Sequence, residues 1–107
     1  MFARIVRFLV VAAALSLPIV AVADAPQVSS DVLPATSSQP VCIARGRTAL
    51  NVAGFQGVGS SGVIAYGHLG EFTAVVHCSA AGQNFAIVAG PDGTTGSNFL
   101  ALIQRSF

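Results

Sequence analysis

Cys42 and Cys78 are the residues of this chain best suited to covalent chemistry, and they are its only two cysteines. Catalytic redox pairs usually lie close together as Cys-x-x-Cys, and these two are far apart. An even count in an oxidising compartment favours a structural disulfide. Closing a loop of about 37 residues would stabilise the fold by roughly 3–4 kcal/mol. We therefore predict a Cys42–Cys78 disulfide, with free or intermolecular thiols as the alternative.

His68 and His77 are the candidates for a metal or acid–base site. A two-residue turn at Leu69-Gly70 would place His68 opposite Glu71 in a hairpin. His77 would then lie about 20 Å from His68, at roughly 3.3 Å per residue. The two imidazoles are therefore predicted to be separate surface groups. We expect no metal, no cofactor and only a weak His68–Glu71 pair.

The segment Gly57–Gly62 matches the pattern G-x-G-x-x-G. A dinucleotide-binding fingerprint needs a strand before the glycines and a helix after them. Here a helix is predicted before the segment and a strand after it, and no acidic residue lies about 20 positions on. The pattern therefore predicts a flexible loop without phosphate binding.

Hydrolytic and nucleic-acid-binding functions have little support. There is no G-x-S-x-G motif, and most serines lie in low-complexity or Gly-rich stretches. Asp92, in a Pro-Asp-Gly turn, is better explained as a turn or helix-start residue. The chain has no Lys, and a nucleic-acid partner needs a basic face. We expect no catalytic residues and no nucleic-acid partner.

The first 23 residues have the three parts of a secretory signal peptide. Arg4 and Arg7 precede an apolar run, which ends at the small-x-small sequence Ala21-Val22-Ala23. A retained membrane anchor over residues 5–23 is the alternative. Cleavage predicts an exported protein, periplasmic or secreted, without membrane attachment. Residues 24–40, rich in Pro and Ser, predict a disordered linker.

Hydrophobic periodicity predicts a small α+β domain over residues 41–107. Residues 41–53 and 95–106 have helical apolar faces, and residues 63–68, 71–79 and 84–89 read as strands. The expected fold has two layers: helix, antiparallel meander of three or four strands, helix, with one disulfide and both helices on one face.

Alternation assigns the strand residues to two faces. Phe72, Ala74, Val76 and Cys78 would face the helices, and we expect the third strand to contribute residues 85, 87 and 89 to that side. The opposite side is the candidate binding surface because exposed apolar patches often bind partners. Its candidate residues are Ile64, Tyr66, His68, Thr73, Val75 and His77. Alternatively, the linker, another element or a second subunit covers this side.

Four features together carry a resemblance. Cys42 begins a helix that closes on Gly54-Phe55, one strand ends at Cys78, and another runs into Ala-Gly-Pro-Asp at residues 89–92. In these features residues 41–107 resemble a group of small exported bacterial proteins of unknown function. The resemblance implies the two-cysteine α+β arrangement and no activity.

The sequence therefore favours an exported, non-catalytic binding protein whose ligand is unknown. Its partner would be another protein or a second copy of the chain. The alternatives are an inhibitor of an extracytoplasmic hydrolase and, less favoured, a small hydrolase or metal-dependent enzyme.

Overall fold

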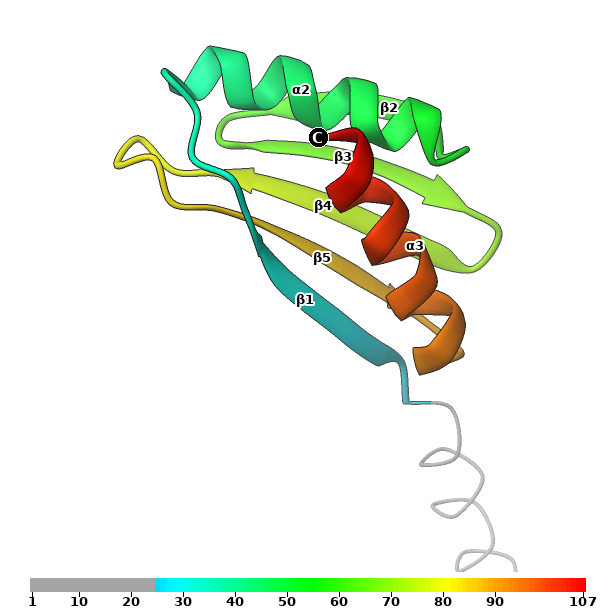
Figure 1. The fold of residues 1–107 in the computed structure, drawn as a ribbon. Helices are drawn as coiled ribbons and strands as arrows, with labels where there is room; N and C mark the ends of the chain where they lie inside the picture. The colour runs from blue at the N-terminus through cyan, green and yellow to red at the C-terminus, as the bar shows by residue number, and fades with distance from the viewer. Residues whose placement is uncertain (1–24) are drawn as a thin grey trace, which may run out of the picture.

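The computed structural model describes residues 25–107, so the predicted signal peptide lies outside the described residues. The elements in chain order are β1 (Gln27–Leu33), α2 (Gln39–Val52), β2 (Gln56–Ser61), β3 (Ile64–Leu69), β4 (Phe72–Cys78), β5 (Asn84–Gly90) and α3 (Gly93–Ser106). The strands form one antiparallel sheet in the order β1-β5-β4-β3-β2 (Figure 1). The predicted two-layer α+β class is confirmed, with five strands in place of three or four.

Both helices lie on the same face of this sheet (Figure 1). Helix α2 packs on β2, β3 and β4, and α3 packs on β1 and β5 and against α2. The buried hydrophobic cluster fills the space between the two layers. We call the face that points away from the helices the outer sheet face.

Helix α2 begins and ends at the residues that the sequence indicates. The Ser38 hydroxyl accepts from the Val41 N–H, and Pro40 occupies the first turn, where its missing N–H costs nothing. At the C-terminus Gly54 has φ +92, and the Phe55 N–H donates to the Leu50 carbonyl at 2.9 Å. This Schellman-type ending turns the chain sharply into β2.

The predicted register of the β3–β4 hairpin is wrong by two residues. The turn consists of Gly70 and Glu71, so Leu69 pairs with Phe72 and His68 with Thr73. Gly70 has φ +59 at the first central position of the turn, a conformation that favours glycine. A two-residue shift keeps the alternation unchanged, and each side chain of the hairpin stays on its predicted face.

Strand β5 lies with the opposite face toward the helices from the one predicted. Phe85, Ile87 and Ala89 pair with His77, Val75 and Thr73 on the outer sheet face. The buried side contains the smaller residues Ala86 and Val88, together with Asn84 and Gly90. Small residues suit this side because both helices approach the sheet closely.

Strand β1 corrects the prediction of a disordered linker over residues 24–40. Its side toward the helices is mostly polar: Ser29 bonds Ser97 at 3.1 Å, and the Gln104 amide donates to Asp31 at 2.9 Å. Only Leu33 on this strand is buried. Hydrogen bonds to β5 and α3 hold β1 in place, so the strand has little apolar signal in the sequence. The folded unit therefore extends N-terminal to residue 41.

Strand β2 corrects the prediction of a flexible loop over the Gly-rich segment. A side chain at Gly59 would lie 2.9 Å from the Tyr66 Oη, and one at Gly57 would lie 2.7 Å from the His68 ring. The glycines therefore make room for two rings from β3, and the segment is a strand rather than a phosphate-binding loop. A bulge between Gln56 and Gly59 interrupts the pairing.

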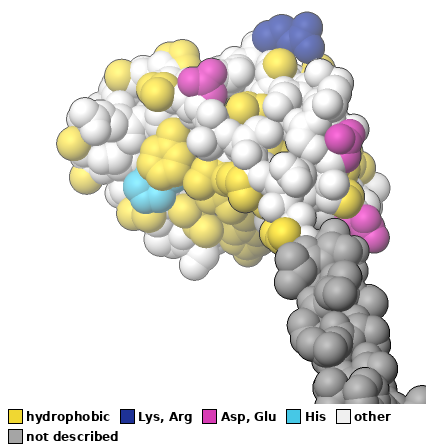
Figure 2. All heavy atoms as spheres, turned by 90° about the horizontal axis from the view of Figure 1, so that it is seen from below, with side chains coloured by type: hydrophobic (Ala, Val, Ile, Leu, Met, Phe, Trp, Pro, Cys, Tyr) yellow, Lys and Arg dark blue, Asp and Glu magenta, His cyan; other side chains and the backbone are white. Residues whose placement is uncertain are grey.

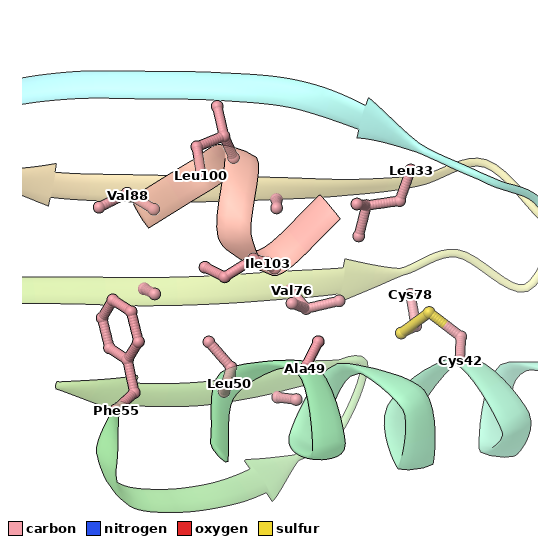
Figure 3. Packing of buried hydrophobic residues seen from close by; sticks show 13 residues of the cluster. Leu33, Cys42, Ala49, Leu50, Phe55, Val76, Cys78, Val88, Leu100 and Ile103 are labelled. Carbon is pink, nitrogen blue, oxygen red and sulfur yellow. A yellow bond between two sulfur atoms is a disulfide. The ribbon is translucent and has the colours of Figure 1, made fainter. Parts of the chain in front are cut away.

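The predicted disulfide joins Cys42 of α2 to Cys78 of β4, and both residues are fully buried (Figure 3). At the other end of α2, the Phe99 ring makes edge-on contacts with Phe55 and Phe72, with centroids 5.5 and 5.1 Å apart. Leu50 and Ile103 fill the core between these two ends. The helical layer is therefore fixed to the sheet at both ends.

Removing the disulfide tests the first of these attachments. The Cys42→Ala/Cys78→Ala variant should unfold at lower urea concentration, with a loss of roughly 3–4 kcal/mol, because the bond closes a loop of 36 residues' separation. A loss below about 1 kcal/mol would contradict a structural role for the bond.

Gly90→Ala tests the close packing beside β5. A methyl group there would lie 2.2 Å from Phe72 Cδ1, and overpacking of this kind typically costs about 1–3 kcal/mol. Gly93→Ala is the matched control, because its nearest heavy atom would be 3.7 Å away. Equal urea midpoints for the two variants would contradict the packing described.

Candidate functional site

The outer sheet face is built from three cross-strand rows of side chains, fixed by the strand register. Each row crosses the sheet from β2 or β3 to β1. The first row is Ser61, Ile64, His77, Phe85 and Val32; the second is Gly59, Tyr66, Val75, Ile87 and Ser30; the third is His68, Thr73, Ala89 and Val28. Most of these residues are apolar, and none is Asp, Glu, Lys or Arg.

All six predicted binding residues lie on this face, on β3 and β4. The structure adds residues that the sequence analysis assigned to the core or to the linker: Phe85, Ile87 and Ala89 on β5, and Val28 and Val32 on β1. The alternation of Val28, Ser30 and Val32 is a period-two signal that could have indicated β1.

Several side chains of the outer sheet face are well exposed. The exposed fractions are 72% for Val32, 65% for Val28 and 38% for Tyr66. Figure 2 shows a contiguous hydrophobic surface beside a histidine on the side seen from below, with the acidic and basic side chains around it. No element among the described residues covers this face, so the question is what binds to it.

The two histidines do not form one site. The His77 ring stacks on Phe85 with centroids 4.7 Å apart, whereas the His68 ring lies over Gly57 on the other side of the sheet's middle strand. His77 pairs with Ile64, four residues before His68, so their predicted separation of six residues was too large. Both imidazoles contribute to the surface rather than to a shared centre.

The acidic residues belong to the framework of the fold. The Gln104 side chain and then the Val32 N–H hold the pKa of Asp31 below its ordinary value of 3.8. Hydrogen bonds from Thr95, through its hydroxyl and then its N–H, lower the pKa of Asp92 in the same way. Asp92 caps α3, as the Pro-Asp-Gly sequence predicts.

A half-open hollow of about 550 Å³ lies at one end of the sheet, where the outer sheet face meets the two neighbouring loops. Asn84 is 1% exposed there, and its amide donates to the Pro34 carbonyl at 3.1 Å and to Thr36 at 3.3 Å. These bonds fix the connection between β1 and α2. Val32 and Phe85 line the hollow and also end the first row, so it continues the apolar surface.

The described residues contain no group of three metal-ligating side chains. Within residues 25–107 no helix is long and apolar enough to cross a membrane. No family model, curated protein or solved structure matches this chain. The functional argument therefore rests on the chain's own surface.

Asp92 gives a pH-dependent test of the α3 cap. Its lowered pKa means that its carboxylate stabilises the fold above the ordinary value of 3.8, and that this stabilisation is lost as pH falls through the lowered value. Asp92→Asn keeps a capping oxygen and should lose only this pH dependence, whereas Asp92→Ala should be less stable at neutral pH. Urea midpoints at neutral and acidic pH measure both effects, and identical profiles for all three proteins would contradict the assigned cap.

Proposed function

We propose that this protein is an exported, non-catalytic interaction protein that binds a protein partner through its outer sheet face. The observation that carries the proposal is the continuous apolar surface of three cross-strand rows without a charged side chain. Monomeric proteins seldom leave a patch of this kind in water unless it has a partner. Tyr66 and Phe85 add aromatic rings, which are enriched in the cores of interfaces.

The disulfide supports an oxidising location. Cys42 and Cys78 are joined and fully buried, and such bonds persist in secreted and periplasmic proteins. The signal-like residues 1–23 support the same location, and so does the resemblance to small exported bacterial proteins. We therefore assign the protein to the periplasm or the extracellular space.

A binding role suits the chemistry of the face better than catalysis does. Its titratable side chains are His68, His77 and Tyr66, and the two imidazoles pack in different directions. A catalytic pair needs its acid and base within hydrogen-bond reach of one substrate. The face provides an area for contact, with Thr73 and Ser30 as its small polar groups.

Serine substitutions test whether the face is a surface or part of a core. Tyr66→Ser/Val75→Ser should keep the far-ultraviolet circular dichroism of the native protein and lose about 1 kcal/mol or less per site, as surface substitutions do. Val52→Ser is the control, since Val52 is 67% exposed on α2. Unfolding of the double variant would place these residues in a core.

Photo-crosslinking then tests binding in the cell. Benzoylphenylalanine in place of Tyr66 should give covalent adducts with a protein partner, because that side chain would lie in the interface. The same group in place of Val52 should give none. Identification of the adduct by mass spectrometry names the partner. Equal labelling from the two positions would count against the outer sheet face as the binding surface.

A further inference from the structure

The composition of the outer sheet face suits contact with an identical surface, and this inference rests on the proposed function. Val75 lies at its centre, on the middle strand of the sheet, between Tyr66 and Ile87. A symmetric dimer needs a patch that is complementary to itself about a twofold axis. An apolar patch with an apolar centre meets this condition when the axis passes near Val75.

We infer that a second copy of this chain covers the outer sheet face. The two sheets pack face to face, with the helices of each copy on the outside. The layers then follow the order helix, sheet, sheet, helix. Sheets that pack in this way lie about 10 Å apart, and their side chains interdigitate.

The distribution of charge favours a second copy over a different protein. Glu71 lies in the β3–β4 turn, Asp31 faces α3, and Arg45 and Arg47 are exposed on α2. Two copies that meet through their outer sheet faces therefore bring no like charges together. Specific recognition of a different protein commonly uses charge complementarity, which this face does not offer.

The area of the face is sufficient for a dimer. The three rows extend about 24 Å across five strands and about 20 Å along them, which gives roughly 500 Å² for each copy. Two copies would bury roughly 1,000 Å², the lower limit for a specific interface. We therefore expect a reversible dimer with a dissociation constant of roughly 1–100 µM.

Association through the strand edges would give a different dimer. Strand β1 is one edge of the sheet, and β2, with its bulge, is the other. Pairing of two β1 strands would extend the sheet and leave Val75 and Tyr66 in water. A charged residue at position 75 therefore distinguishes face-to-face packing from edge pairing.

The test is sedimentation velocity from about 1 to about 200 µM, a range that spans the expected dissociation constant. The protein is expressed as the full chain, and intact mass establishes the length of the purified product. The wild type should change from monomer to dimer within this range. Val75→Arg should weaken the dimer by at least about 100-fold, because it buries two like charges near the axis. Val52→Arg, on α2, should dimerise as the wild type does.

Circular dichroism establishes that each variant is folded, and Ile87→Arg replaces Val75→Arg if the latter does not fold. A wild type that stays monomeric at the highest concentration would overturn the inference. A dimer that persists in both arginine variants would also overturn it, in favour of edge pairing. If the protein is monomeric but Tyr66 crosslinks to a different protein, only the second-copy inference fails. A monomer without crosslinks from position 66 removes the proposed function as well.

Discussion

The structure depends on the close approach of two helices to one face of a five-stranded sheet. The space between the layers admits only small residues at several points: a side chain at Gly46 would lie 2.9 Å from Val76, and Ala74 and Ala86 are fully buried. The Cys42–Cys78 disulfide fixes one end of this contact, as Figure 3 shows. Because both helices lie on that face, the opposite face has no cover among residues 25–107.

The elements that bury apolar side chains could be predicted from the sequence. Helix α2 and helix α3 were identified by their periodicity, and the disulfide by the count and context of the cysteines. Strand β1 was not, because hydrogen bonds of Ser29 and Asp31 to α3 take the place of an apolar face. Strand β2 was not, because glycines normally weaken strands and here make room for the Tyr66 and His68 rings.

The candidate site was predicted in part for the same reason. The residues of β3 and β4 were assigned to the correct face, since alternation survives a two-residue change of register. Phe85 and Ile87 were assigned to the core because large apolar residues are usually buried. The close approach of the helices reverses this preference on β5, where the small residues Ala86 and Val88 are buried. The outer sheet face is consequently more apolar than the sequence indicated.

An uncovered apolar face explains the proposed binding function, and a second copy is the simplest cover for it. Tyr66 reports on this cover directly, because it is the chain's only tyrosine and there is no tryptophan. The decisive measurement is acrylamide quenching of tyrosine fluorescence across a dilution series. We expect Tyr66 to be shielded at high protein concentration and to become accessible to the quencher on dilution. Full accessibility at every concentration would contradict the account.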